Sequence, residues 1–318
     1  MSGTEASSAT EQRLTDAAPR AAGGRRRKGG RGRGGEQSMV PEAVFTSYYG
    51  RPIVKAAPWK GEIPAYMFAG GLAAGASMIA AGAELTGRPA LRRVGRLGAI
   101  GGLSFSMAAL IHDLGKPSRF LNMLRVLKLT SPMSVGTWIL SLYGPPAGVA
   151  AAAEVVRMLP EEVRSQRPWS LARFVDRPAG VLAAVFAPPV AAYTAVLLSD
   201  TANPSWHAAY KELPFVFVSS GAAAAAGLAL VGAPTSESGP VRRLAAGAAT
   251  VELVAEQGME RSMGITAEPL HAGRAGRLMR ASKLLTAAGA VGAVALGRSR
   301  VGAAASGLAL MAGSLCLR

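Results

Sequence analysis

Residues 64–86 read PAYMFAGGLAAGASMIAAGAELT, and the only charged side chain in this run, Glu84, lies close to its end. At 1.5 Å per residue, a helix of this length crosses the roughly 30 Å hydrocarbon layer of a bilayer. The apolar residues fill the run instead of recurring on one helical face. The pattern therefore predicts a membrane-spanning helix rather than an amphipathic helix of a soluble core.

Seven further apolar runs follow, so the chain is predicted to be an all-α integral membrane protein, a bundle of about eight transmembrane helices. The eight runs cover residues 64–86, 95–114, 133–158, 179–199, 213–233, 241–258, 282–297 and 300–317. The last two runs are the shortest, and one span through both is the alternative. Half of the residues are hydrophobic but only 6% are aromatic, and the abundant Ala and Gly favour closely packed helices.

The region before the bundle divides into two predicted segments. Residues 1–40 are predicted to form a disordered basic tail, because 8 of the 35 Lys and Arg fall between Arg13 and Arg33 in a Gly-rich stretch. Residues 41–62 are predicted to be an interfacial lead-in, since Tyr48, Tyr49 and Trp59 occur there. Residues 63–318 then form the transmembrane bundle.

The net charge of +16 raises the question of nucleic-acid binding. The basic tail has no aromatic residues on which bases stack, so no specific nucleic acid is expected as a partner. Contact with anionic lipid remains an alternative to a solvated tail that simply stays on one side of the membrane, and the solvated tail is the preferred interpretation.

The distribution of Lys and Arg predicts a multi-pass protein of the plasma membrane with a cytoplasmic N-terminus. In that orientation the inner segments carry 22 Lys and Arg and the outer loops carry 13. Without the 8 basic residues of the tail the balance is 14 against 13, so the predicted orientation depends on the tail.

Short loops reverse the direction of successive helices, so alternate helix ends meet at the same end of a bundle. This rule gathers twelve polar and aromatic residues at one end: Trp59, Glu62, Tyr66, His112, Asp113, Ser131, Ser134, Thr137, Trp138, Trp206, His207 and His271. The segments 200–212 and 260–283 are expected at the same end. Such a surface suits a soluble partner docked above a ligand site, and ordinary interfacial anchoring is the alternative.

His112 and Asp113 close an otherwise apolar run, where ionisable side chains cost free energy unless they are paired or hydrated. One interpretation is proton transfer, and the other is a solvated helix end. Adjacent helical residues point about 100° apart, so the two side chains need not touch each other.

Several carboxylates also lie within or near the runs. Glu252 and Glu256 are four residues apart and share one helix face. Together with Asp113 they form the candidate proton relay. Pairing with arginines or burial in headgroups is the alternative, and it is favoured for Glu84 and Glu154 because they lie at the far ends of their runs.

The absence of certain residue patterns limits the chemistry of the chain. Its single cysteine, Cys316, can neither form an internal disulfide nor hold an iron-sulfur cluster alone. Among the histidines only His112 adjoins a run, so a transmembrane haem is not expected. We therefore expect no metal or covalently bound cofactor and no catalysis by the chain alone.

Two blocks resemble the NrfD family, also called the polysulphide reductase membrane-subunit family. They are WKGEIPAYMFAGGLAAG at 59–75 and IHDLGKPSRFLNMLRVLKLTSPMSVGTWIL at 111–140. The segments TSYYGRPIVK at 46–55 and ELVAEQGMERSMGI at 252–265 are similar to short actinobacterial-type members. The resemblance covers roughly residues 45 to 300.

The resemblance implies a quinone-interacting anchor of a complex iron-sulfur molybdoenzyme. Its expected partners are a ferredoxin-like [4Fe-4S] subunit and a molybdopterin catalytic subunit, with formate dehydrogenase as the expected type of complex and menaquinone as the exchangeable substrate. Carried over onto the matching blocks, the quinone-binding residues are Tyr66, His112, Asp113, Ser134, Thr137 and Trp138. Polysulphide reductase is thought to bind quinone through a first-helix histidine, and the first span here has none.

Two other functional classes remain open. In the first, the chain is an ion or proton transporter or channel whose path includes Asp113, Glu252 and Glu256, with no quinone site. In the second, it is a passive anchor that only tethers a soluble enzyme to the membrane.

Overall fold

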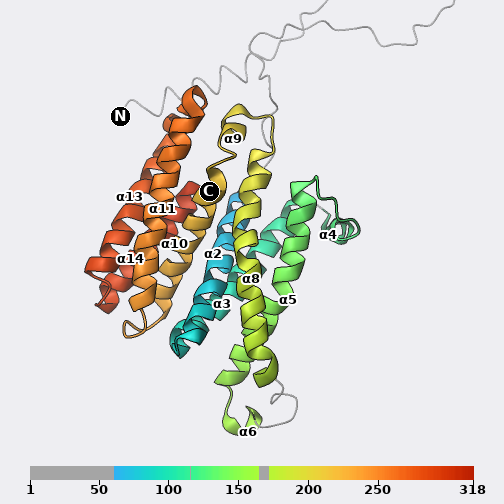
Figure 1. Ribbon diagram of the computed structural model, residues 1–318, viewed down its shortest axis with the longest axis vertical. Helices are drawn as coiled ribbons and strands as arrows, with labels where there is room; N and C mark the ends of the chain where they lie inside the picture. Colours follow the sequence, from blue (N-terminus) through green and yellow to red (C-terminus); the bar gives the residue numbers. More distant parts are fainter. Residues whose placement is uncertain (1–60, 115, 165–171) are drawn as a thin grey trace, which may run out of the picture. The chain divides into compact units, whose positions relative to one another are not determined.

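The computed structural model describes residues 61–114, 116–164 and 172–318. The predicted tail (1–40) and residues 41–60 of the predicted lead-in lie outside these residues. Within the described part every regular element is helical. The long helices form one bundle (Figure 1), which confirms the predicted fold class.

Eight long helices correspond one to one to the eight predicted runs. They are α2 (Glu62–Leu85), α3 (Pro89–Asp113), α5 (Pro132–Met158), α8 (Ala172–Ser199), α10 (Leu213–Gly232), α11 (Gly239–Met263), α13 (Gly273–Ala295) and α14 (Arg300–Leu317). Short helices lie between them: α4 (Phe120–Met123), α6 (Glu161–Arg164), α9 (Pro204–Ala208) and α12 (Glu268–His271). Three of the long helices, α3, α8 and α13, begin six to nine residues before the predicted runs, because their first turns carry charged residues.

Seven of the eight long helices in the described residues are long and apolar enough to cross a membrane. The exception is α11, which carries six charged residues: Arg242, Arg243, Glu252, Glu256, Glu260 and Arg261. The two final runs are separate spans of 23 and 18 residues, so the alternative of one span through both is wrong. Of the eight predicted spans, the sixth, α11, is therefore the one that is not apolar enough to cross a membrane. The sequence had instead pointed to the last two runs, because they are the shortest.

The centre of the bundle is formed by α2 and α10. About 72% of the apolar window of α2 and 67% of that of α10 are buried, against 22–44% for the other five spans. A Cβ added to Gly221 of α10 would lie 2.9 Å from the carbonyl oxygen of Gly71 in α2, so the two backbones touch where both residues lack a side chain. This close approach through small residues agrees with the predicted tight packing.

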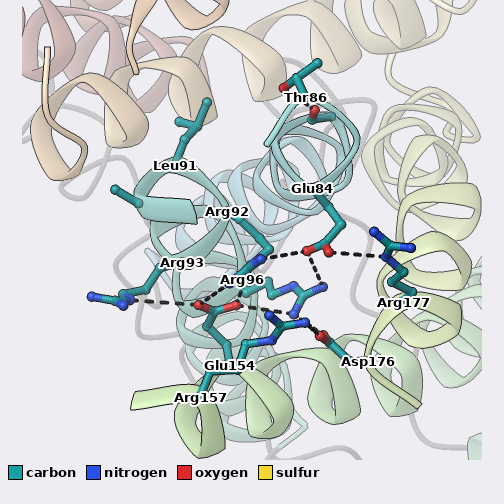
Figure 2. A network of polar contacts seen from close by, with 12 residues as sticks. Glu84, Thr86, Leu91, Arg92, Arg93, Arg96, Glu154, Arg157, Asp176 and Arg177 are labelled. Atoms are coloured by element: carbon teal, nitrogen blue, oxygen red, sulfur yellow. Dashed lines mark hydrogen bonds and ion pairs between the residues drawn. The ribbon is translucent and has the colours of Figure 1, made fainter. Parts of the chain in front are cut away.

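A network of ion pairs joins α2, α3, α5 and α8 at the lower end of the bundle as drawn in Figure 1 (Figure 2). Its carboxylates are Glu84, Glu154 and Asp176, and its guanidinium groups are Arg92, Arg93, Arg96, Arg157 and Arg177. Arg92 lies 2.8 Å from Glu154 and 3.0 Å from Glu84. The favoured alternative for Glu84 and Glu154, pairing with arginines, is thereby confirmed.

Arg96 is the hub of this network. Its side chain is only 3% exposed, and it contacts Glu84 at 3.4 Å, Glu154 at 3.3 Å and also Asp176. Glu154 and Asp176 are fully buried. Because an unpaired charge in such surroundings costs several kcal/mol, each helix of the network depends on charges supplied by the others.

Replacing Glu154 by glutamine keeps the volume of the side chain but removes the charge that faces Arg92 and Arg96. We expect Glu154→Gln to destabilise the bundle by about 3–5 kcal/mol, as in the breaking of other buried ion pairs. The melting temperature in detergent is the measurement. Glu268→Gln, at an exposed acid of α12, is the control, and equal melting temperatures for both variants would contradict a structural role of the network.

Candidate functional site

The upper end of the bundle in Figure 1 collects the amino-terminal turns of α2, α5, α10 and α13 and the carboxyl-terminal turns of α3, α8, α11 and α14. The connections α3–α5, α8–α10 and α11–α13 lie there and contain the short helices α4, α9 and α12. This is the end at which alternation of helix direction was expected to gather the polar residues. Two adjoining cavities open beneath these connections.

The smaller cavity, here called the Tyr66 cavity, has a volume of about 90 Å³. It lies among α2, α3, α5 and α8, and its lining includes three of the six predicted quinone-binding residues, Tyr66, Asp113 and Thr137. Tyr193 and Thr194 of α8 add two more hydroxyl groups. The structure thus brings polar side chains that are far apart in the sequence, such as Tyr66 and Thr194, to the wall of the same cavity.

Each polar group of the Tyr66 cavity has a different environment. The Tyr66 side chain is buried, and the backbone carbonyl of Tyr66 accepts a hydrogen bond from the Ser106 hydroxyl at 3.0 Å. Thr137 donates its hydroxyl to the carbonyl of Met133 at 2.9 Å, so its oxygen can still accept. Asp113 is exposed at the end of α3 and can exchange protons with water.

Gly136 positions one wall of this cavity. The ring of Tyr193 lies directly against it, where any Cβ would collide with the ring. A glycine beside Thr137 therefore allows α5 and α8 to approach and places Tyr193 in the lining. Sequence reasoning missed Tyr193, since a tyrosine within an apolar run gives no sign of which neighbour it faces.

The other three predicted quinone-binding residues do not line the Tyr66 cavity. Ser134 accepts a hydrogen bond from the Lys128 amide and donates to the Val126 carbonyl, both at 3.0 Å, so it fixes the segment before α5. The His112 side chain is 78% exposed, and its Nδ1 lies 3.6 Å from Glu62. The indole N–H of Trp138 is buried and has no partner among the described residues.

The larger cavity, here called the Arg318 cavity, has a volume of about 520 Å³. It lies on the other side of α2, and its mostly apolar lining comes from α2, α8, α9, α10, α11, α12, α13 and the end of α14. Its polar lining residues are Asn203, Ser205, Trp206 and Arg318. The two cavities share Ile63, Met67 and Leu198 as lining residues, so these three side chains lie between them.

Arg318 is held in place by α10 and α14. It donates hydrogen bonds to the Ser314 hydroxyl at 2.7 Å and to the Phe217 carbonyl at 2.9 Å. Its guanidinium carbon also lies 4.9 Å from the centre of the Phe217 ring, a cation–π contact. Nothing in the sequence pattern indicated that an arginine after the last apolar run turns back into the bundle.

The two acids of α11 that belong to the predicted proton relay lie inside the bundle. Glu252 and Glu256 are each 1% exposed. Thr286 of α13 approaches Glu252 at 3.5 Å, while one carboxylate oxygen of each acid is buried without a partner among the described residues. The third member of the predicted relay, Asp113, lines the Tyr66 cavity instead.

No group of three or more His, Cys, Asp or Glu side chains in the described residues is arranged to hold a metal ion. The polar groups that line the two cavities include hydroxyls, a carboxylate, an amide and a guanidinium, all of which can form hydrogen bonds.

Comparison with protein families gives one match. The family model described as "Polysulphide reductase, NrfD" matches residues 53–239, which is more than half of the chain. Curated proteins give no match. The matched segment contains every residue that lines the Tyr66 cavity, whereas α13, α14 and nearly all of α11 lie beyond it.

Proposed function

The chain belongs to the polysulphide reductase NrfD family, and from this premise we propose that it is the quinone-exchanging membrane subunit of a multi-subunit redox complex. The observation that carries the proposal is the Tyr66 cavity. It is built wholly from the segment that matches the family, and it combines three hydroxyl-bearing aromatic or threonine side chains, Tyr66, Thr137 and Tyr193, with a solvent-accessible carboxylate, Asp113.

Reduction of a quinone to a quinol adds two electrons and two protons, one proton to each carbonyl oxygen. In this proposal Tyr66 donates a hydrogen bond to one carbonyl oxygen, and Thr137 lies beside the ring. Asp113 passes protons between the cavity and the surrounding water, because its carboxylate touches both. The electrons come from or go to an iron-sulfur partner docked above the cavity.

The size of the cavity sets a condition for binding. Ligand sites for small organic molecules usually have volumes of about 300–1,000 Å³, so a quinone ring needs more room than the Tyr66 cavity offers. Three methionines line it, Met67, Met123 and Met133, and methionine side chains adapt readily to a ligand. A change of rotamer at Met67 would connect the Tyr66 cavity with the 520 Å³ Arg318 cavity.

Substitutions in the Tyr66 cavity test the quinone site. We expect Asp113→Asn to lower quinone turnover by about 10²-fold, the usual effect of removing a proton-transferring group. Tyr66→Phe removes one hydrogen bond and should weaken quinone binding by about 2- to 10-fold. Turnover of a soluble menaquinone analogue by the assembled complex is the measurement.

Matched controls come from the same end of the bundle. Asp200→Asn and Tyr210→Phe make the same chemical changes at exposed positions that line neither cavity. The proposed site is wrong if Asp113→Asn and Tyr66→Phe leave both turnover and binding of a quinone-site inhibitor at the level of these controls.

We also propose that Asp113, Glu252 and Glu256 form the proton-handling groups of the subunit. The support is the burial of the two glutamates beside Thr286 and their unpaired carboxylate oxygens, which suit groups that take up and release protons. The glutamates line neither cavity, so water beyond the cavity walls would have to complete the relay between them and Asp113.

Glu256→Gln tests this relay because it keeps the shape of the side chain and removes its proton exchange. We expect turnover to fall at least tenfold while binding of the quinone analogue stays unchanged, with Glu268→Gln as control. Unchanged turnover would refute the relay. Proton conduction by the chain alone in vesicles, lost in Glu256→Gln, would instead favour the transporter hypothesis.

The connection from Leu114 to Ser131 supports docking of a soluble partner. It carries four exposed bases and no acid: Lys116, Arg119, Arg125 and Lys128. It also exposes large apolar side chains, among them Leu121 at 66%, Val126 at 68% and Leu129 at 79%. Exposed apolar residues rimmed by one sign of charge suit a protein partner of the opposite charge.

We propose that this partner is a ferredoxin-like [4Fe-4S] subunit, which links the chain to a molybdopterin catalytic subunit. The proposal also includes a formate dehydrogenase-type complex and menaquinone as the quinone. It places the chain in the plasma membrane with a cytoplasmic N-terminus. Its support is the family resemblance and the distribution of Lys and Arg. A chain that only tethers an enzyme is the competing hypothesis, and the Asp113 and Tyr66 variants decide between the two.

Charge reversal in the α3–α5 connection tests docking. We expect Arg125→Glu to reduce the amount of iron-sulfur subunit that co-purifies with the tagged chain by several fold, and the loss should grow as salt falls, because like charges then repel more strongly. Arg243→Glu, at an exposed arginine of the opposite end of the bundle, is the control. Equal recovery of the partner with both variants would exclude this surface.

A further inference from the structure

We propose that the lower end of the bundle binds the phosphate group of an anionic phospholipid, in a cavity beside the ion-pair network (Figure 2). This cavity has a volume of about 220 Å³ and lies among α2, α3 and α8. Its lining residues are Ala81, Glu84, Leu85, Arg96, Arg177, Gly180 and Val181. The inference does not depend on the quinone site, which lies at the other end of the same helices.

The charges around the cavity do not balance. In the ion-pair network of Figure 2, as far as the structure describes it, five arginines face three carboxylates. Of the residues that line the cavity, Arg96 and Arg177 are the bases and Glu84 is the acid, while Arg96 also pairs with Glu154 and Asp176 behind the wall. Excess positive charge next to an apolar helix surface is costly unless an anion neutralises it, and a phosphate group is the anion that a membrane supplies.

Arg96 has a donor left over for this anion. Its side chain is 3% exposed, yet its Nε is buried and has no hydrogen-bond partner among the described residues. Gly180 forms the wall beside the guanidinium group, since a Cβ there would lie 3.1 Å from Nη2 of Arg96. The missing side chain at position 180 therefore leaves the guanidinium at the surface of the cavity.

Arg177 provides the second cationic group. Its Nε lies 3.5 Å from Glu84, while its side chain is 79% exposed, so most of its donors face away from the protein. Figure 2 shows Arg177 reaching from α8 toward Glu84 of α2. Arginine is suited to phosphate because its planar fork can donate two parallel hydrogen bonds.

The apolar part of the cavity favours a lipid over a free phosphate ion. Leu85 is 83% exposed and Val181 is 52% exposed, and both belong to the lining. Leu182 and Val185 continue this exposed apolar surface along α8. Acyl chains attached to a bound phosphate would lie against these side chains, whereas inorganic phosphate would make no use of them.

Lipid retention by the purified chain tests the proposal. The chain in detergent is mixed with phosphatidylglycerol or with phosphatidylcholine, and bound lipid is counted by native mass spectrometry. We expect preferential retention of phosphatidylglycerol, reduced about fivefold in Arg177→Gln, the usual effect of one basic residue on an anionic lipid. Arg243→Gln, the same change at an exposed arginine of α11 at this end, should retain as much as the wild type.

A second variant keeps all charges. Ala81→Leu fills the cavity with apolar volume and should lower retention of phosphatidylglycerol at an unchanged melting temperature. If Arg177→Gln does not fold, this variant alone tests whether the cavity binds the lipid. The proposal is overturned if Arg177→Gln and Ala81→Leu retain phosphatidylglycerol like the wild type. It is also overturned if excess inorganic phosphate displaces the lipid completely, because the site then recognises a free anion.

Discussion

Charge neutralisation inside an apolar bundle is the constraint on which the rest of this structure depends. Glu154 and Asp176 are completely buried, and Arg96 is the residue that ties them to Glu84. None of these charges is tolerable alone in a membrane. Because each helix of the network supplies charge to the others, α2, α3, α5 and α8 must meet at their lower ends, and their upper ends are thereby brought around one small cavity.

The second constraint is the contact of α2 with α10. Since Gly71 and Gly221 let these backbones touch, α2 lies in the centre of the bundle and has a cavity on each side near its start. Met67 lines both. The proposed quinone site and the large apolar cavity therefore share a wall that contains a flexible methionine side chain, an arrangement in which the ligand space can change while the helix axes stay fixed.

Much of this architecture could be predicted from the sequence. The length of an apolar run indicates whether a helix lies in lipid, and the alternating direction of successive helices indicates which helix ends lie together. The eight helices and the gathering of Tyr66, Asp113 and Thr137 were predictable on these grounds. The direction of each side chain was not, since it depends on the rotation of a helix about its axis. Ser134 and Thr137 are three residues apart, yet the first fixes a connection and the second lines the cavity. The inward direction of the Arg318 side chain was equally hidden, because it depends on contacts with Phe217 and Ser314.

The ion-pair network also bears on how the chain enters a membrane during synthesis. The hairpin of α2 and α3 brings Glu84 to Arg92 and Arg96, but this one acid faces two arginines. Glu154 and Asp176 arrive only with α5 and α8. Pairing of these charges therefore favours entry of the first four long helices into lipid as a group, after α8 has been synthesised. The helices α10 to α14 are then added to a core whose buried carboxylates already have their partners.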